Sequence, residues 1–237
     1  MNELTPYQAK YIAYELTRRF PSGSSEKFNV ALMDAQVDLN PHQVESALFA
    51  FKSPLSKGAI LADEVGLGKT IEAGILLSQL WAERRKKLLI ICPANLRKQW
   101  SQELYDKFFL DTIILENKNF NEFVKSGKRN PFDQNKIIIC SYQFARAKAD
   151  LMQLISWDLA VVDEAHRLRN VYKPTNKIGN AIKEALSHSR KALLTATPLQ
   201  NSLLELYGLV SIIDEHTFGD IKSFRSQFLR TVEGENY

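Results

Sequence analysis

The chain has 237 residues, of which 45% are hydrophobic and 24% are charged, an ordinary composition for a globular protein with a full apolar core. No apolar run approaches the ~18 residues of a membrane span, and the charged, aromatic N-terminus is unlike a signal peptide, so we expect neither a membrane protein nor a secreted one. We therefore expect a cytoplasmic protein. The formal net charge of +4 permits an anionic partner without requiring one.

The cysteines and histidines give no sign of a disulfide or of a zinc site. Cys92 and Cys140 each close an apolar run, which favours small, buried hydrophobic side chains. The histidines are scattered along the chain, without the Cys/His spacing that zinc requires.

The first predicted elements are helical. Residues 5–20 form a predicted helix, with a threonine that can cap it, a proline in its first turn and apolar side chains at helical spacing. Residues 21–29 are polar and are predicted to form a loop, and a second helix is predicted to start after Pro41. We interpret residues 1–37 as a helical N-terminal extension and residues 38–237 as the main domain.

Beyond residue 57, short apolar runs alternate with helix-like segments. Their continuous hydrophobicity predicts strands that are covered on both faces, and hence an α/β domain with a mainly parallel sheet and helices on both faces. The polar, basic segment 117–136 is interpreted as a surface excursion. The predicted strands are residues 58–62, 88–92, 112–115, 136–140, 159–163 and 191–195.

The stretch LADEVGLGKTIEA (61–73) joins a predicted strand to a predicted helix through a glycine-rich loop. A phosphate-binding loop reads G-x-x-x-x-G-K-[ST], and here Asp63 stands where the first glycine is expected. In such a loop, backbone N–H groups wrap a phosphate, Lys69 would reach the β- and γ-phosphates, and the Thr70 hydroxyl would ligate Mg²⁺. A plain glycine turn with an incidental lysine is the alternative. The predicted nucleotide-binding residues here are Asp63, Glu64, Val65, Gly66, Leu67, Gly68, Lys69 and Thr70.

The segment VVDEAHRLRN (161–170) ends a predicted strand with two adjacent carboxylates. Asp163 at the strand tip is suited to hold Mg²⁺, and Glu164 can polarise an attacking water as a general base. Acidic strand ends are common, but one that follows a phosphate loop and precedes Ala165 and His166 indicates a nucleotide-hydrolysing site. The predicted catalytic residues are Lys69 and Glu164.

A third segment, KALLTATPLQN (191–201), is another predicted strand that ends in a turn. Hydroxyl groups at this strand tip could bond to the DEAH segment and relay its state, so Thr195, Ala196 and Thr197 are candidate coupling residues. Taken alone, the segment is a plain strand-to-turn sequence.

Together, the three motifs resemble the Swi/Snf-type branch of the superfamily 2 helicase-type ATPases, and within it the RNA-polymerase-associated members from bacteria. In that branch the loop reads D-E-x-G-L-G-K-T, so Asp63 is normal there. The resemblance covers roughly residues 38–230. It implies a RecA-like P-loop domain that binds ATP and Mg²⁺ and acts on nucleic acid. Double-stranded DNA is the expected partner, and association with the bacterial nucleoid is the expected location in the cytoplasm.

The resemblance also implies roles for residues outside the three motifs. DLNPHQ (38–43) resembles the family's Q motif, in which Gln43 would read the adenine edge; taken alone, Gln43 looks like a solvated residue in the first turn of a helix. LLIICPANLRKQW (88–100) and CSYQFAR (140–146) resemble motifs that face DNA, although packing of Trp100 beside solvated basic residues explains the first equally well. The implied nucleic-acid contacts are Pro93, Asn95, Arg97, Ser141 and Tyr142.

In this family ATP lies between two RecA-like lobes, and the second lobe supplies arginine fingers that stabilise transition-state charge. Nothing like a second lobe follows residue 201, so we interpret the chain as the first lobe, with slow or no ATP hydrolysis unless the second lobe joins it. Three alternatives stay open: a strand-separating or RNA-acting helicase, a non-catalytic nucleotide-binding module, and a small-molecule kinase. The sequence assigns no protein partner.

Overall fold

The computed structural model describes these parts of the chain: residues 40–53, 55, 57–62, 68–200 and 202–229. The helix predicted at residues 5–20, the loop predicted at 21–29 and residues 63–67 of the glycine-rich loop lie outside the described residues. The division of the chain at residue 37 and the nucleotide-binding roles of Asp63, Glu64, Val65, Gly66 and Leu67 therefore stay predictions.

In the described part of the chain, six strands form one sheet in the order β1-β6-β5-β2-β4-β3, and every neighbouring pair is parallel. This confirms all six predicted strands and the parallel α/β class. The strands are β1 (Gly58–Leu61), β2 (Leu88–Cys92), β3 (Thr112–Ile114), β4 (Ile137–Ser141), β5 (Leu159–Asp163) and β6 (Lys191–Leu194).

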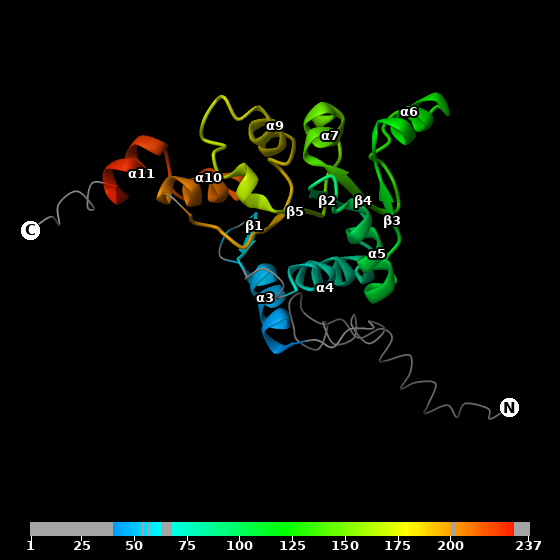
Figure 1. The fold of residues 1–237 in the computed structure, drawn as a ribbon, viewed down its shortest axis with the longest axis horizontal. Helices are drawn as coiled ribbons and strands as arrows, with labels where there is room; N and C mark the ends of the chain where they lie inside the picture. The colour runs from blue at the N-terminus through cyan, green and yellow to red at the C-terminus, as the bar shows by residue number, and fades with distance from the viewer. Residues whose placement is uncertain (1–39, 54, 56, 63–67, 201, 230–237) are drawn as a thin grey trace, which may run out of the picture.

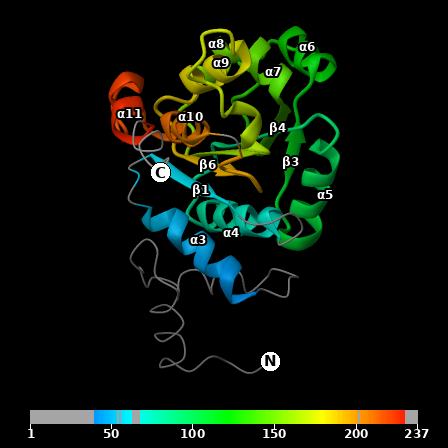
Figure 2. The same ribbon diagram turned by 60° about the vertical axis from the view of Figure 1, so that its left-hand side comes forward.

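Helices cover both faces of this sheet (Figure 1, Figure 2). On one face lie α3 (Pro41–Lys52), α4 (Lys69–Ala82) and α5 (Arg97–Phe108). The other face carries α6 (Asn117–Lys125), α7 (Tyr142–Ala147), α8 (Ala149–Gln153), the 3₁₀ turn η1 (Ala165–Leu168), α9 (Lys177–Ala185) and α10 (Leu203–Ile213). The last described helix, α11 (Ile221–Phe228), packs its Phe224 ring 4.9 Å from that of Tyr207 in α10.

The core consists of two apolar layers, one on each side of the sheet. Along β2, Leu88 and Ile90 belong to the layer under α3, α4 and α5, whereas Leu89 and Ile91 belong to the opposite layer. Successive side chains of a strand point to opposite faces, so a strand that is buried on both faces must be apolar at every position. This is the physical reason that the strands appear in the sequence as unbroken apolar runs.

The strand register brings the ends of three strands level with one another. Leu61 at the end of β1 pairs with Leu194 of β6, and Leu194 pairs in turn with Asp163 at the end of β5. Because neighbouring strands lie ~4.8 Å apart, the two outer strands of this trio end about 10 Å from each other. The glycine-rich loop and the DEAH segment therefore leave the same edge of the sheet.

Most residues of the segment 117–136 are exposed, which agrees with the predicted surface excursion, but the segment also has anchors in the core. The segment begins with the helix α6, and it buries two aromatic side chains, Phe120 and Phe132, with exposed fractions of 2% and 0%. Their ring centroids lie 6.0 Å apart, and Phe132 also lies 6.2 Å from Trp157. The polar residues of the segment dominate its composition, but these two rings anchor it in the core.

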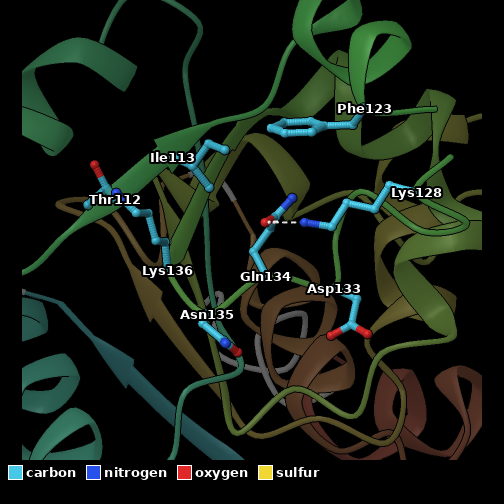
Figure 3. A pocket seen from close by; sticks show the side chains of 8 residues that line it. All are labelled: Thr112, Ile113, Phe123, Lys128, Asp133, Gln134, Asn135 and Lys136. Atoms are coloured by element: carbon cyan, nitrogen blue, oxygen red, sulfur yellow. Dashed lines mark hydrogen bonds between the residues drawn. The ribbon is translucent and has the colours of Figure 1, made fainter. Parts of the chain in front are cut away.

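The hollow beside this segment measures about 650 Å³ and is lined partly by charged side chains (Figure 3). Two of these charged groups have partners: Lys128 Nζ donates to the amide oxygen of Gln134 at 2.7 Å, and Asp133 pairs with Lys87, which lies outside the lining. The hollow lies beside the starts of β3 and β4, away from the strand ends that carry the predicted motifs. It holds no predicted site residue, so its size does not identify a functional site.

Both cysteines are free and buried, as their positions in apolar runs predicted. Burial raises the pKa of the Cys92 thiol to about 12 and raises the pKa of the Cys140 thiol further. Both thiols are therefore protonated at neutral pH and behave as small apolar side chains.

Candidate functional site

The carboxylate of Asp163 is held in place from two sides at the end of β5. Its Oδ2 accepts the indole N–H of Trp100 at 2.8 Å, and its Oδ1 accepts the backbone N–H of Glu164 at 2.8 Å. The backbone carbonyl of Asp163 accepts a hydrogen bond from the Tyr142 hydroxyl. Three elements of the fold thus fix the position of this acidic residue, which is only 8% exposed.

Burial raises the pKa of the Asp163 carboxyl above its ordinary value, and the charge of Glu164 adds to this effect. The hydrogen bonds from Trp100 and from the Glu164 backbone, together with the charge of Lys69, act in the opposite direction because they favour the ionised form. These groups offset part of the effect of burial, but the pKa stays above its ordinary value.

Glu164 turns the chain sharply out of β5. Its φ of 54° and ψ of 44° lie in the left-handed region, which a residue other than glycine occupies at a cost of order 1–3 kcal/mol. This turn starts η1. The Glu164 Oε2 atom lies 3.1 Å from His166 Nδ1, so these two members of the DEAH motif face each other.

Helix α4 begins directly after the glycine-rich loop. Gly68, its N-cap residue, has φ 92°, and a Cβ added there would lie 2.2 Å from Gln43 Nε2. The left-handed backbone therefore favours glycine at this position, and a side chain here would also displace the Gln43 amide. The first turn of α4 starts at Lys69, and the positive end of a helix dipole favours a bound phosphate.

A cavity of about 430 Å³ brings the two motifs together. It extends from the first turn of α4 to the tip of β5, with α5 forming one wall. The predicted catalytic and metal-binding side chains all line it. The lining residues are Gly68, Lys69, Thr70, Ile71, Leu96, Gln99, Trp100, Glu103, Lys107, Asp163 and Glu164.

The oxygens that line this cavity fit a magnesium ion bound together with a nucleotide. Thr70 offers a hydroxyl and Asp163 a carboxylate, and hard oxygen ligands are those that Mg²⁺ prefers. No group of three or more His, Cys, Asp or Glu residues in the described part of the chain could enclose a metal by itself. Water and nucleotide phosphates would have to complete the coordination, which is the usual arrangement for Mg²⁺.

Gln43 is buried, with an exposed fraction of 3%, so it is not the solvated residue that its local sequence suggested. Its side-chain oxygen accepts the Asn40 N–H at 3.3 Å in a capping box at the start of α3. At the other end of α3, Arg190 donates to the carbonyls of Ala50 and Phe51 at 3.1 and 2.7 Å. Both ends of this helix are therefore fixed, with Gln43 beside Gly68.

The residues predicted to contact nucleic acid have different environments. Asn95 is exposed, and Arg97 is partly exposed, with its Nη1 3.3 Å from Glu116 Oε2. Pro93 is buried; Ser141, also buried, accepts the Phe144 N–H at 3.2 Å and so caps α7. Tyr142 is 3% exposed and binds the carbonyl of Asp163. The nucleic-acid roles of all five stay predictions.

The predicted coupling residues lie at the end of β6. Thr195 is buried, and its hydroxyl accepts the Thr197 N–H at 3.2 Å; Ala196 lies between them. The segment is joined to the DEAH region by a different side chain, because Arg169 Nη1 donates to Gln200 Oε1 at 2.6 Å. The coupling role of the three residues stays a prediction.

A model of the SNF2-related domain family matches residues 16–237. The chain belongs to this family. The match spans both the glycine-rich loop and the DEAH segment, and it confirms that the chain is related to the Swi/Snf-type ATPases.

Relatives of this SNF2-related chain include the RNA polymerase-associated protein RapA from two Yersinia species. It is 36% identical to the Yersinia pseudotuberculosis protein and 35% identical to that of Yersinia pestis, each over 208 residues. These matches cover 84% of this chain and 21% of the relatives, so the chain spans about a fifth of their length.

The fold of the SNF2-related chain is similar to that of a solved SWI2/SNF2 ATPase core from Sulfolobus solfataricus in complex with double-stranded DNA. The TM-score is 0.71 at 25% identity, and the match covers 86% of this chain and 42% of that one. A second structure of the same core domain gives a TM-score of 0.68 at 24% identity, which supports the fold alone. Both agree with a RecA-like parallel α/β domain.

Two residues of this SNF2-related domain contact its motifs although sequence reasoning did not assign them a role there. Trp100 contacts Asp163, and Arg169 links the DEAH region to the segment after β6. Both lie within the quoted motif stretches, but the sequence alone did not show what they touch.

Within the described residues, no helix is both long and apolar enough to cross a membrane.

Proposed function

We propose that this chain is the ATP-binding lobe of an ATP-driven translocase that acts on double-stranded DNA. The observation that carries the proposal is the single cavity lined by Lys69 and Thr70 from the start of α4 and by Asp163 and Glu164 from the end of β5. Membership of the SNF2-related family supports the assignment to this class of ATPase.

Each side chain has a role that follows from its chemistry. Lys69 would neutralise the β- and γ-phosphates, and Thr70 and Asp163 would hold Mg²⁺, which when bound would neutralise phosphate charge. Glu164 accepts a proton from the attacking water, and its contact with His166 limits where its carboxylate can lie. Gln43, which lies beside Gly68, would read the adenine edge.

Hydrolysis by this site requires a cation from elsewhere. Among the described residues that line the cavity, Lys69 and Lys107 are the basic ones and none is arginine. An arginine finger contributes about 10³ to 10⁵ in rate in related phosphoryl-transfer enzymes. We therefore propose that a second RecA-like lobe supplies this group, and that the chain alone binds nucleotide but hydrolyses it slowly or not at all.

Double-stranded DNA is the proposed nucleic acid because a solved structure of similar fold is in complex with it. The formal charge of +4 suits a partner bound through its phosphates, with contacts that carry little sequence information. Asn95 and Arg97 on the loop and helix after β2 are the candidates with exposed side-chain atoms. A cytoplasmic, nucleoid-associated location is part of the proposal.

The proposal is tested by nucleotide binding and by hydrolysis. Binding of a fluorescent ADP with Mg²⁺ should be detectable and should weaken by at least about tenfold in Lys69→Ala, which loses a charge-assisted hydrogen bond to phosphate. Lys222→Ala, a change at an exposed lysine of α11, is the matched control. Equal binding by both variants would exclude the proposed nucleotide site.

Hydrolysis of ATP is then followed with duplex DNA, single-stranded DNA and RNA. Turnover should stay near background in all four conditions, the nucleic-acid-free one included. Duplex-stimulated turnover would overturn the requirement for a second lobe, and RNA-specific stimulation would overturn the choice of DNA.

A further inference from the structure

Trp100 and Asp163 belong to different elements, and they meet at the wall of the nucleotide cavity. Trp100 lies in the first turns of α5 and is 3% exposed, whereas Asp163 ends β5. The indole Nε1 donates to Asp163 Oδ2 at 2.8 Å, with both groups buried. Both residues also line the cavity that holds Lys69 and Thr70.

An indole N–H that is buried needs an acceptor, but a backbone carbonyl suffices for that purpose. Trp157 illustrates the ordinary solution, because its Nε1 donates to the Met152 carbonyl at 3.0 Å. Trp100 instead uses a carboxylate whose other oxygen is already held by the Glu164 N–H at 2.8 Å. With a separate donor on each oxygen, the plane of the Asp163 carboxylate cannot rotate freely.

We propose that Trp100 is a positioning residue for magnesium binding, which orients the Asp163 carboxylate through the hydrogen bond from its indole. The proposal rests on the proposed function, in which Asp163 holds the ion. A carboxylate that faces a metal is generally oriented by donors in the surrounding shell, and loss of such a donor typically costs about 10–100-fold in metal affinity.

The placement of Trp100 on α5 gives this contact a second consequence. Arg97, one turn earlier on the same helix, is a candidate contact for nucleic acid and is tied to Glu116. A shift of α5 would move the donor to Asp163 directly. The helix therefore carries both a candidate nucleic-acid contact and the hydrogen-bond donor to the proposed metal ligand.

The test is the gain in ADP affinity that Mg²⁺ produces, measured as the ratio of dissociation constants with EDTA and with Mg²⁺. Trp100→Phe keeps an aromatic ring but removes the donor, and it should reduce this gain by about tenfold while the EDTA value stays the same. The control is Trp157→Phe, which also removes an indole hydrogen bond, but one made to a backbone carbonyl outside the cavity. It should leave the ratio unchanged. An unchanged ratio in Trp100→Phe would overturn the proposal.

The wild-type chain provides a measurement that does not depend on how the variants fold. It contains three tryptophans, so the indole ¹H–¹⁵N resonances form a small set, which the two variants assign. Addition of Mg²⁺ to the ADP-bound chain should shift the Trp100 indole resonance and leave that of Trp157 in place. A Trp100 resonance that does not respond to Mg²⁺ would overturn the positioning role.

Failure of this inference and failure of the proposed function give different results. If wild-type ADP binding shows no gain with Mg²⁺ and survives Lys69→Ala, the nucleotide site itself is wrong. If the gain is present and sensitive to Lys69 but insensitive to the Trp100 donor, only the positioning role is excluded.

Discussion

Arg169 and Glu205 form an ion pair between the segment that follows the DEAH motif and the first turn of α10. Arg169 Nη1 lies 3.5 Å from Glu205 Oε2, and the Glu205 side chain is only 8% exposed. The same Glu205 oxygen accepts the backbone N–H of Gln200 at 3.1 Å, while Arg169 donates to the side chain of that residue. The pair thus joins the DEAH region, the turn after β6 and α10.

The first prediction concerns the energy of this pair. Arg169→Met and Glu205→Gln should each lower the free energy of unfolding by about 1–3 kcal/mol, because each leaves a largely buried charge without its opposite. The double variant should lose less than the sum, with a coupling of roughly 1 kcal/mol or more in a double-mutant cycle. Urea denaturation measures all four proteins. Additive losses would show that the two side chains do not interact.

The second prediction concerns Gly208, which packs α10 against the same segment. A Cβ added there would lie 1.9 Å from the carbonyl oxygen of Arg169, a contact that backbone atoms cannot tolerate. In the interior of a helix, Gly→Ala normally stabilises by about 1 kcal/mol. Gly208→Ala should have the opposite sign and lower the melting temperature.

The control for this change is Gly127→Ala, at a glycine with φ 90° and open space around its Cβ position. It should cost only the conformational strain of about 1–2 kcal/mol for a left-handed residue with a side chain. If Gly208→Ala proved stabilising, the close packing of α10 against Arg169 would be contradicted.

The third prediction concerns Lys191, a buried lysine in β6. Its Nζ donates to the carbonyl of Ile213 at the end of α10, and its exposed fraction is 1%. Burial lowers the pKa of this lysine from 10.5 to about 8, helped by the charge of Lys57. Weaker influences come from Asp214, Lys183 and Glu215.

The sign of the pH dependence follows from this lowered pKa. Between pH 8 and 10.5 the unfolded lysine keeps its proton while the folded one has lost it, so the free energy of unfolding rises with pH in this window. Below pH 8 the folded protein bears the full cost of the buried charge, about 3 kcal/mol.

Lys191→Met should remove this contribution to the pH dependence, and it should be more stabilising, or less destabilising, at pH 7 than at pH 9.5. Denaturant titrations at both pH values give the free energy of unfolding of wild type and variant. The contributions of the other titrating groups largely cancel when the two proteins are subtracted. Lys222→Met, at an exposed lysine, should show no such difference. A Lys191→Met effect that is equal at both pH values would contradict the lowered pKa.

The fourth prediction concerns the aromatic anchor of residues 117–136. Phe132 is fully buried, and its ring centroid lies 6.0 Å from that of Phe120 and 6.1 Å from that of Phe144. Phe132→Ala should lower the free energy of unfolding by about 3–5 kcal/mol, because it leaves a cavity among these rings. Val124→Ala, at a side chain 49% exposed on α6, should change it by at most about 0.5 kcal/mol. An equally small effect of Phe132→Ala would contradict its role as the anchor of this segment.

Local patterns were sufficient to predict the strands, the parallel sheet and the family. An unbroken apolar run such as LLIIC is typical of a strand that is buried on both faces. Pro41, with its asparagine cap, marks the start of α3. The parallel arrangement also implies that strand ends meet at one edge, so Lys69 and Asp163 could be expected near each other. These features depend on neighbours in the sequence or on simple topology.

The partners of individual side chains were decided by the tertiary structure. Trp100 and Asp163 are 63 positions apart, and their contact depends on how α5 packs against the sheet. The same holds for Arg169, which meets Gln200 only because η1 and the turn after β6 lie side by side. Phe132 belongs to the core although its segment is polar. A sequence displays periodicity and composition, whereas the hydrogen bond that orients a buried carboxylate depends on which distant elements fill the space around it.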